Sequence, residues 1–402
     1  MNLNADVVVV GGGPCGSFSA FKMAKLGIKV LVCEEHSEIG VPSHCPGHVS
    51  LQGLKQLGLH LPKEIVENEI KSAIFISPSG LEFRVQFAAP VTCVLNRTLF
   101  DKFLARLAEE AGAEYRIGTR VDSFLLDSGK VKGVLASNEA LRSKLVIDCE
   151  GCSSLLLKKA GLPTLNRTMV VQGVEAEVDR IESVEDEAVE VYLGEKYAPG
   201  LYAWIIPRQD GSAKIGLATN RGNPEAYLQR FVKHHPKAKS KLKDSRIVKI
   251  SYHPITLGGP LAQIYHDGLL VVGDAASQVK PTTGGGIIMG LNCAQIASET
   301  AHEAIKQDNT SANFLSIYQK RCQEMIGFDM AVMRRMRSLL NRLSDRQLDR
   351  IIAISSQIGL DKSLADVGDI DFQGRGIRPL IKSPAAWTVA LYTIISSLTS
   401  PF

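Results

Sequence analysis

The stretch Asp6-Val-Val-Val-Val-Gly-Gly-Gly-Pro-Cys-Gly16 decides the fold of this chain. Its four valines predict a buried β-strand, and helical spacing follows over residues 17–26. In such a strand-turn-helix unit the first glycine permits a tight turn, the second lets backbone N–H groups approach a diphosphate, and the third lets the helix pack on the strand. The positive end of the helix would face the diphosphate. We assign five residues to this dinucleotide-binding turn: Gly11, Gly13, Pro14, Cys15 and Gly16.

A second predicted strand, over residues 29–33, ends at an acidic residue. Glu34 lies at the spacing from the turn at which a carboxylate accepts hydrogen bonds from a ribose 2′-OH. An acid there favours an adenosine ribose without a 2′-phosphate, and we include the neighbouring Glu35 in the predicted site. The strand, helix and acid in register predict nucleotide binding, with FAD and NAD both open at this point.

Length and composition predict a globular protein of two or three domains. The chain has 402 residues, of which 45% are hydrophobic, and a formal net charge of +4 with 22% charged residues. This mildly basic balance gives no footprint for nucleic acid, so we expect no nucleic-acid partner. No export signal precedes the first strand, and no charge-free apolar run in the body of the chain reaches the ~18 residues of a membrane span, which predicts a cytoplasmic protein.

The cysteines are predicted to be reduced core residues. Eight of them occur, most in apolar patterns, as is typical of an intracellular protein. Cys149 and Cys152 have the spacing of a redox pair, but they follow a buried strand over residues 145–148, and no second cysteine pair completes a zinc site. We interpret this pair as part of a structural turn and predict no metal.

Strand patterns divide the chain into a nucleotide-binding domain and an inserted sheet. Residues 74–85 have the pattern of a hairpin, and residues 166–257 are mostly strands with one helix over residues 224–234, as expected of an antiparallel sheet around a substrate cavity. The chain then returns through a buried strand, Gly268-Leu-Leu-Val-Val-Gly-Asp274, and a helix over residues 287–306. We therefore predict an α/β (α+β) fold with a Rossmann-type domain of residues 1–70, 96–165 and 258–310, a substrate domain of residues 71–95 and 166–257, and a helical C-terminal region of residues 311–402.

A second glycine-rich segment follows the returning strand: Gly273-Asp-Ala-Ala276, then Pro281-Thr-Thr-Gly-Gly-Gly286. With the opening turn, it resembles the geranylgeranyl reductase family of FAD proteins, whose fold is shared with p-hydroxybenzoate hydroxylase-like monooxygenases, over roughly residues 1–350. The resemblance implies a Rossmann-type FAD-binding domain, with Asp274 beside the ribityl and diphosphate groups and loop glycines whose backbone N–H groups reach the isoalloxazine ring and the phosphates. It adds these cofactor-binding residues: Gly273, Asp274, Pro281, Gly284, Gly285, Gly286 and Ile287.

The resemblance extends to an arginine and to an acidic turn. Arg97 matches the family's arginine that opens a helix beside the flavin, where a guanidinium can hold a diphosphate by two hydrogen bonds. Val121, at the start of a predicted strand, completes this part of the predicted cofactor site. The family's Asp-Gly signature falls at Glu150-Gly151, where glutamate replaces aspartate. This departure argues against a nicotinamide-binding role there and leaves Asp148 as the alternative.

Two aromatic residues are predicted to form a wall of the substrate cavity. The segment Pro199-Gly-Leu-Tyr-Ala-Trp-Ile-Ile-Pro207 is similar to the reductases' Tyr-x-Trp-x-Phe-Pro motif, with Ile206 in place of the second ring. On a strand, Tyr202 and Trp204 point to the same face. We expect a flat apolar wall against which an isoprenoid lies; the alternative is a pair of core aromatics.

The segment Pro42-Ser-His-Cys-Pro-Gly47 lies where the reductases carry a cysteine beside the flavin's reactive edge. The resemblance implies that Cys45 positions substrate, donates a proton or pairs reversibly with another thiol such as Cys293. His44 and His48 flank it, and we predict solvated histidines of a turn rather than metal ligands. Pro46 and Gly47 join Cys45 among the predicted cofactor-binding residues.

The resemblance implies a flavin-dependent oxidoreductase acting on CH–CH groups, a geranylgeranyl reductase of archaeal membrane lipid biosynthesis. Reduced flavin would supply a hydride, and an acid a proton, to an alkene of a geranylgeranyl lipid or isoprenoid diphosphate, with Cys45, Tyr202 and Trp204 as catalytic residues. The electron donor would be NAD(P)H or a ferredoxin-like protein. Two alternatives stay open: an FAD monooxygenase acting on an aromatic or polyprenyl compound, and a non-enzymatic FAD-stabilised lipid-binding protein.

The C-terminal residues 383–402 contain no charged side chain. Two interpretations of this segment stay open: docking onto the body or a partner subunit, and interfacial contact with a membrane. The second would place a cytoplasmic protein peripherally at the inner face of the cell membrane.

Overall fold

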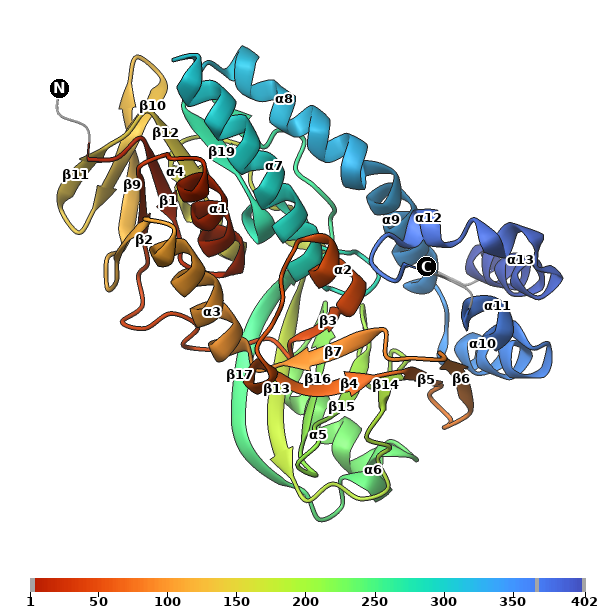
Figure 1. The fold of residues 1–402 in the computed structure, drawn as a ribbon. Helices are drawn as coiled ribbons and strands as arrows, with labels where there is room; N and C mark the ends of the chain where they lie inside the picture. Colours follow the sequence, from red (N-terminus) through yellow and green to blue (C-terminus); the bar gives the residue numbers. More distant parts are fainter. Residues whose placement is uncertain (1–3, 366–368, 400–402) are drawn as a thin grey trace.

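The computed structural model describes residues 4–365 and 369–399 and contains two large β-sheets surrounded by helices (Figure 1). The first sheet lies at the upper left of Figure 1, the second (green and yellow) lies below it, and the last helices (blue) lie on the right. A parallel Rossmann-type sheet, antiparallel sheets and a helical C-terminal region confirm the predicted fold class.

The first sheet has six strands, all parallel except one edge strand. Every residue of its central strands is buried. Because both faces of these strands are covered, their sequences are continuous apolar runs and do not alternate between apolar and polar residues. The strands lie in the order β18 (Tyr265–His266), β19 (Leu269–Val271), β12 (Leu145–Asp148), β1 (Val7–Val10), β2 (Val30–Cys33) and β8 (Glu114–Arg116).

Helices and a small meander pack around this sheet. Helix α1 (Pro14–Lys25) contacts both α3 (Arg97–Glu110) and α7 (Ile287–Lys306). A three-stranded meander contacts β12 and carries the short helix α4 (Leu155–Lys159) against its first strand. The meander consists of β9 (Val121–Asp127), β10 (Lys130–Ala136) and β11 (Glu139–Arg142).

The second sheet has seven strands drawn from residues 72–86 and 170–256. Neighbouring strands are antiparallel except for one parallel pair, in which residues 188–192 lie beside residues 72–76. Their order is β17 (Arg246–Thr256), β13 (Val170–Asp179), β16 (Ala213–Thr219), β15 (Ala203–Pro207), β14 (Ala188–Tyr192), β5 (Ser72–Ile76) and β6 (Glu82–Gln86).

One face of the second sheet is closed by its own helices. Helices α5 (Pro224–His234) and α6 (Ala238–Lys241) cover it, and the rings of Tyr192, Phe231 and His235 pack edge to face behind the sheet. The opposite face is directed toward the first sheet and is available to line a cavity.

A small sheet joins the two large ones. Its strands β3 (His48–Ser50), β7 (Thr92–Leu95) and β4 (Val66–Ile70) lie with β7 in the middle, and helix α2 (Leu51–Gln56) follows β3. Strand β7 leads directly into α3 of the first sheet, and β4 leads into β5 of the second. The polypeptide thus crosses between the sheets twice within this short segment.

The C-terminal region is helical, as predicted. Helix α8 (Ala312–Cys322) packs on α7 and continues through a π-helical turn, Gln323–Gly327, into α9 (Phe328–Leu340). The last four helices are α10 (Asp345–Gln357) and α11 (Leu360–Ala365), which contact β6, α12 (Gln373–Gly376), which contacts α9, and α13 (Pro384–Thr399), which contacts α9, α10 and α11. Residues 400–402 of the uncharged C-terminal segment lie outside the described residues.

Several predicted elements match the structure closely, and one long strand was missed. The predicted helices over residues 224–234 and 287–306 coincide with α5 and α7. Strand β17 was not predicted as a strand, because it is an edge strand whose first residues are exposed on both faces and so lack period-two hydrophobicity. Strands β3 and β4 were not predicted either, because they are short and belong to a sheet completed only by β7.

Candidate active site

A cavity of about 1020 Å³ lies between the two large sheets. It is lined by the turn between β1 and α1, by residues 40–46, by residues 282–287 and by the inner face of the second sheet. The predicted cofactor-binding and substrate-binding segments, distant in sequence, therefore meet around one space. These predicted cofactor-binding residues line it: Gly11, Gly13, Pro14, Cys15, Gly16, Glu34, Glu35, Cys45, Pro46, Arg97, Val121, Gly273, Asp274, Gly284, Gly285, Gly286 and Ile287.

The opening turn is built from glycines with different constraints. Gly11 has φ +90°, and a Cβ there would lie 2.6 Å from the carbonyl oxygen of Cys149. A Cβ on Gly16 would lie 1.9 Å from the carbonyl oxygen of Gly11, so this glycine is required for the turn itself. Gly13 differs, because nothing lies within 4 Å of the position of its Cβ. Space is therefore kept clear in front of Gly13, at a helix N-terminus without a side-chain cap, which suits a diphosphate.

Glu34 ends β2 at the edge of this cavity and is 8% exposed. Its Oε2 accepts a hydrogen bond of 2.7 Å from the Gly12 N–H, and its Oε1 accepts one of 2.9 Å from the His36 N–H. The carboxylate is thus fixed against the turn, in the position predicted for a ribose acceptor. The neighbouring Glu35 is exposed and lies 3.8 Å from Arg120.

The second glycine-rich segment ends at the start of α7. Gly286 is the N-cap of this 20-residue helix and provides no side-chain cap, so a second helix N-terminus opens onto the cavity. Gly273 has φ +74°, and a Cβ there would lie 2.8 Å from the sulfur of Cys15, which brings the two glycine segments into contact. Pro281 and Gly47 do not line the cavity: Pro281 accepts a hydrogen bond from Arg337, and Gly47 packs against Leu95.

Arg97 is arranged differently from the prediction. Its guanidinium donates three hydrogen bonds of 3.0 to 3.1 Å to the Asp101 carboxylate, so the fork expected to hold a diphosphate is taken by a neighbour one helical turn away. Burial opposes its charge, yet Asp101 raises the pKa of Arg97 above its ordinary value. The same guanidinium lies beside the Cys45 thiol. Arg97 is therefore a permanent cation beside Cys45.

The Cys45 loop lines the cavity without a disulfide. All eight cysteines are free, and Cys293, the thiol suggested as a partner, is fully buried beside Cys322. The flanking histidines are not the solvated pair that we predicted. His44 stacks on His253 with ring centroids 5.4 Å apart, and His48 shares a hydrogen bond of 2.7 Å with the Thr92 hydroxyl. Burial lowers the pKa values of both, that of His48 to about 4.

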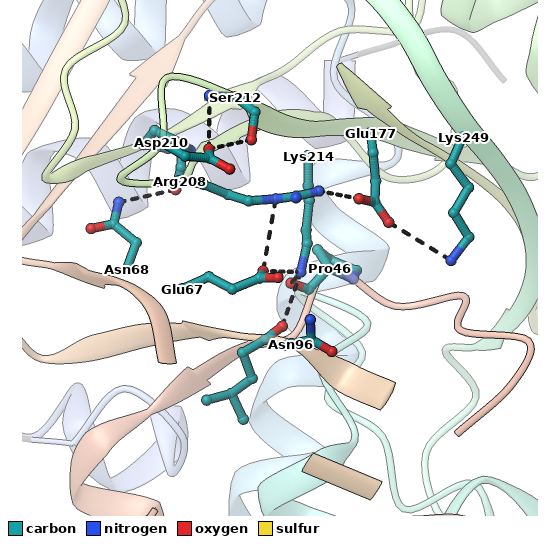
Figure 2. A network of polar contacts seen from close by, with 12 residues as sticks. Pro46, Glu67, Asn68, Asn96, Glu177, Arg208, Asp210, Ser212, Lys214 and Lys249 are labelled. Atoms are coloured by element: carbon teal, nitrogen blue, oxygen red, sulfur yellow. Dashed lines mark hydrogen bonds and ion pairs between the residues drawn. The ribbon is translucent and has the colours of Figure 1, made fainter. Parts of the chain in front are cut away.

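Lys214 fixes the Cys45 loop from the second sheet (Figure 2). Its ammonium donates hydrogen bonds to the carbonyl oxygens of Pro46 at 3.0 Å and Leu95 at 2.9 Å, and lies 2.6 Å from Glu67. The chain of charges continues through Arg208, Glu177 and Lys249. Sequence reasoning missed Lys214; the signal was a lysine inside a strand that is otherwise apolar except for its last residue, Thr219.

The aromatic wall is present on the cavity side of the sheet. The rings of Tyr202 and Trp204 lie 6.0 Å apart, edge to face, and both residues line the cavity. The Tyr202 hydroxyl donates a hydrogen bond of 2.7 Å to the carbonyl oxygen of Thr283. A Cβ on Gly216 would lie 2.5 Å from the Trp204 ring, so a glycine on the next strand leaves room for the indole. The remaining apolar lining on this side includes Ala73, Phe75, Val189, Val191, Leu193 and Ile206.

The other half of the same sheet face is polar, and sequence reasoning did not identify its residues. Strands β13 and β17 contribute Glu175, Ser251 and His253 to the cavity. Glu175 is 7% exposed, and its Oε2 has no hydrogen-bond partner in the described part of the chain. Along the sheet, the cavity thus changes from mainly polar at β13 and β17, where Ile255 is also part of the lining, to mainly apolar at β15, β14 and β5.

One group of potential metal ligands occurs among the described residues. One ligand atom from each of Cys152, His253 and Asp274 lies within 4.8 Å of the others. The Cys152 thiol is 3.5 Å from Asp274, and burial raises its pKa, which keeps the sulfur protonated. A protonated thiol is a poor metal ligand.

The acidic turn has a structural role at the start of α4. The Glu150 carboxylate accepts hydrogen bonds from the N–H groups of Leu155 at 2.7 Å and Leu156 at 3.1 Å, at the start of α4. An acid in this position stabilises a helix N-terminus. Asp148, the alternative, is fully buried and does not line the cavity, and burial raises its pKa.

The comparisons with known proteins agree with this geometry. The FAD binding domain family matches residues 4–325. Digeranylgeranylglycerophospholipid reductase 2 of Methanopyrus kandleri is 35% identical over 356 residues, which cover 86% of this chain and 89% of that protein. The chain belongs to this family of FAD-binding reductases. The family member from Methanocaldococcus jannaschii, digeranylgeranylglycerophospholipid reductase, is 34% identical over 352 residues, 86% of this chain and 89% of its own.

Solved structures of the family and of more distant proteins share the fold. A geranylgeranyl bacteriochlorophyll reductase-like protein from Thermoplasma acidophilum has a TM-score of 0.86 and 28% identity, over 96% of this chain and 99% of its own. A flavin-dependent brominase has a TM-score of 0.69 and 19% identity over 96% of this chain and 97% of its own, a likeness of fold alone. Family membership establishes FAD as the cofactor, as predicted.

Proposed function

We propose that this protein saturates carbon–carbon double bonds in the geranylgeranyl chains of archaeal ether lipids or their precursors. The observation that carries the proposal is the apolar half of the cavity, which begins at Tyr202 and Trp204 and is tied to the glycine loop by the bond from Tyr202 to Thr283. Its family relatives bear the name digeranylgeranylglycerophospholipid reductase. An isoprenoid lying on this wall would be held next to the cofactor.

One set of residues binds the cofactor, and another binds the geranylgeranyl chain. Reduced FAD, when bound, supplies the hydride. The N-termini of α1 and α7 hold the diphosphate through backbone N–H groups, and Glu34 accepts hydrogen bonds from the ribose. Tyr202, Trp204 and the apolar strands beside them orient the alkene and exclude water. Cys45, on the opposite wall beside Arg97, lies where it would position the substrate or pass a proton to it.

The substrate would enter from a membrane surface. The cavity extends to Leu364 and Leu380, close to α13, whose exposed residues include Trp387 and Leu391, each 59% exposed. Arg378 and Lys382 lie just before this helix, where they suit anionic headgroups. No helix within residues 4–365 and 369–399 is long and apolar enough to cross a membrane, so we propose peripheral contact at the cytoplasmic face.

Vesicle binding tests the membrane proposal. Leu391→Glu is expected to abolish co-sedimentation with vesicles of anionic ether lipid, because a charge is introduced into the apolar face. Leu126→Glu on β9, also an exposed leucine at 55%, is the matched control and keeps wild-type binding. Equal binding by both variants would exclude α13 as the contact.

Anaerobic turnover tests the reductase activity itself. The purified protein with its FAD reduced is mixed with geranylgeranyl ether lipid in the absence of oxygen. We expect oxidation of the flavin together with a product heavier by two hydrogens per reduced bond. If the flavin stays reduced until air is admitted and the product carries oxygen, the protein is a monooxygenase. If the lipid binds and neither reaction occurs with reduced flavin, it is a lipid-binding protein.

The electron donor is NAD(P)H or a ferredoxin-like protein, and the same preparation distinguishes them. Flavin reduction by NADH, NADPH and reduced ferredoxin is followed by absorbance without lipid. The chain carries one dinucleotide fingerprint, at Gly11 to Gly16, and FAD occupies it in the proposal. We expect reduction to be fastest with the ferredoxin-like donor, because no second fingerprint is present in the sequence to bind a nicotinamide nucleotide.

A further inference from the structure

Glu175 is the one acid of β13 whose side chain is both almost fully buried and part of the cavity lining. The carboxyl group lies on the polar half of the sheet face, between Ser251 of β17 and Gly216 of β16 in the strand register. On the far side of Gly216, in the same row, stands Trp204, whose ring covers the glycine. The acid and the aromatic wall thus face the same space.

This carboxyl group is not held in an ion pair. Its Oε2 is buried and has no hydrogen-bond partner among the described residues. Burying a carboxylate without a partner is costly, so structural carboxylates in protein interiors are normally paired. An unpaired buried acid at a cavity wall is the arrangement expected of a group that exchanges a proton with a ligand.

The charges that face Glu175 come from its own strand, from the two neighbouring strands and from one helix. They are Lys214 on β16, Glu177 on β13, Lys249 on β17 and Arg97 on α3. The three cations are already paired with other acids: Lys214 with Glu67, Arg97 with Asp101 and Lys249 with Glu177. None of them therefore neutralises Glu175 fully, and Glu177 carries the same charge as Glu175. Burial raises the pKa of Glu175 to about 7, although Lys214 opposes the rise. The group therefore gains and loses a proton near neutral pH.

We propose that Glu175 is the general acid that donates the proton to the alkene; this inference rests on the proposed reductase function. The two electrons of the alkene π bond form a C–H bond with the proton from the Glu175 carboxyl group. Hydride from reduced FAD forms the second C–H bond at the neighbouring carbon and carries two electrons, so the flavin is oxidised and the alkene is reduced. Glu175 is left as a carboxylate and regains its proton from water.

The test compares Glu175→Gln with a matched control, Glu182→Gln. Glutamine has the size of a protonated glutamate but cannot act as an acid, and Glu182 is exposed beyond the end of β13. Both variants are expected to bind FAD and lipid as the wild type does. In anaerobic rapid mixing, flavin oxidation by geranylgeranyl lipid should slow by about 10²-fold or more in E175Q, as expected for loss of a general acid, and should not change in E182Q.

A second readout does not depend on turnover. Infrared difference spectra of the FAD-loaded protein without lipid, recorded during a pH titration, should show loss of a protonated carboxyl band with a midpoint near pH 7, and E175Q should lack this band. A wild-type rate in E175Q, or no such band in the wild type, overturns the assignment. If the wild-type protein itself fails to reduce the lipid, the proposed function fails instead, which separates the two outcomes.

Discussion

The hydroxyl of Tyr202 donates a hydrogen bond of 2.7 Å to the carbonyl oxygen of Thr283. The first residue leads into β15 of the second sheet, and the second lies in the loop before α7. A side chain of the predicted substrate wall is therefore bonded directly to the predicted flavin loop. This bond fixes the position of the aromatic wall relative to the loop. Hydride transfer to a bound chain requires such a fixed position, because the reacting atoms must be held within van der Waals reach.

Tyr202→Phe is expected to weaken this relation without changing the apolar wall. The Thr283 carbonyl loses its partner, which costs about 1 kcal/mol and corresponds to about a fivefold weaker binding of FAD if the loop is held by this bond. Titration of apoprotein with FAD measures the change. Tyr252→Phe is the control, because the Tyr252 hydroxyl bonds to Glu225 on the exposed surface. Equal effects of the two substitutions would contradict the proposed link.

Gly13→Ala and Gly16→Ala separate the fold of the opening turn from its ligand. Gly16 has no room for a Cβ, so its alanine variant is expected to lose folded protein altogether. Gly13 has room and φ −68°, so its alanine variant should fold normally. We expect the affinity of Gly13→Ala for FAD to fall at least tenfold, because the methyl group enters the space assigned to the diphosphate. Circular dichroism of the apoprotein and FAD titration measure the two effects.

Gly327→Ala controls for the substitution itself. Gly327 lies in the π-helical turn, and its added Cβ would meet only ordinary contacts, the nearest at 3.7 Å. This variant should fold and bind FAD as the wild type does. Normal FAD affinity in Gly13→Ala would show that the diphosphate lies elsewhere.

The sequence predicted those parts of the molecule whose physics is local. Four consecutive valines, a glycine turn and a helix define β1 and α1 within 25 residues. A short apolar strand, a glycine-rich loop and a helix define β19 and α7 in the same way over a longer stretch. The alternation around Tyr202 also placed both aromatic rings on one face. Arg97 was found but its partner was not, because a salt bridge with Asp101 competes with any ligand and the pattern alone does not show which interaction is stronger.

Residues whose role depends on distant partners were missed. Lys214 bonds to Pro46, 168 positions away, and nothing near it in sequence indicates that contact. Glu175 looks like an ordinary member of an alternating strand, and only the register of β13 between β17 and β16 turns it inward. The rest of the site could not be predicted because burial of a polar residue is a property of the assembled sheets.

Lys214→Met is expected to destabilise the protein by about 3 kcal/mol, since Glu67, which is 17% exposed, keeps only its longer contact of 3.7 Å with Arg208. Lys249→Met is the control, because Lys249 is 47% exposed and its ion pair is worth little. Urea unfolding measures the difference. If Lys214→Met does not fold, Lys214→Arg is used instead, because it keeps the positive charge. Faster hydrogen exchange at residues 45–47 in Lys214→Arg would show that the Cys45 loop is held less firmly. Unchanged exchange would contradict a positioning role.

His235 is expected to make the second sheet sensitive to acid. This fully buried ring donates a hydrogen bond of 3.2 Å from Nε2 to the Ser77 carbonyl oxygen and accepts one at Nδ1 from the Lys237 N–H. Burial lowers its pKa from 6.5 to about 4. The unfolded chain binds a proton below pH 6.5 and the folded chain does not, so stability falls as pH drops from 6.5 to 4. The difference between the pKa values of His235 in the unfolded and folded states corresponds to a loss of about 3 kcal/mol in the free energy of unfolding.

Unfolding in urea at pH 7 and pH 4.5, followed by Trp204 fluorescence in a Trp387→Phe background, measures this loss. His235→Asn should be less stable at pH 7 and should show a weaker dependence on pH. His60→Asn, at an exposed position, should keep the wild-type dependence. A wild-type dependence in His235→Asn would exclude His235 as its source.

The titration of Glu175 is expected to lower the stability of the folded protein as pH rises, whereas that of His235 lowers it as pH falls. Burial raises its pKa from 4.5 to about 7, so the unfolded chain loses a proton above pH 4.5 while the folded chain still holds one. Stability therefore falls as pH rises from 4.5 to 7, by about 3 kcal/mol for this one group. Glu175→Gln resembles the protonated form at every pH. The free energy of unfolding of this variant should match that of the wild type near pH 4.5 and exceed it by about 3 kcal/mol at pH 8. A difference between the two proteins that stays constant across this range would show that Glu175 is ionised throughout and could not serve as the acid.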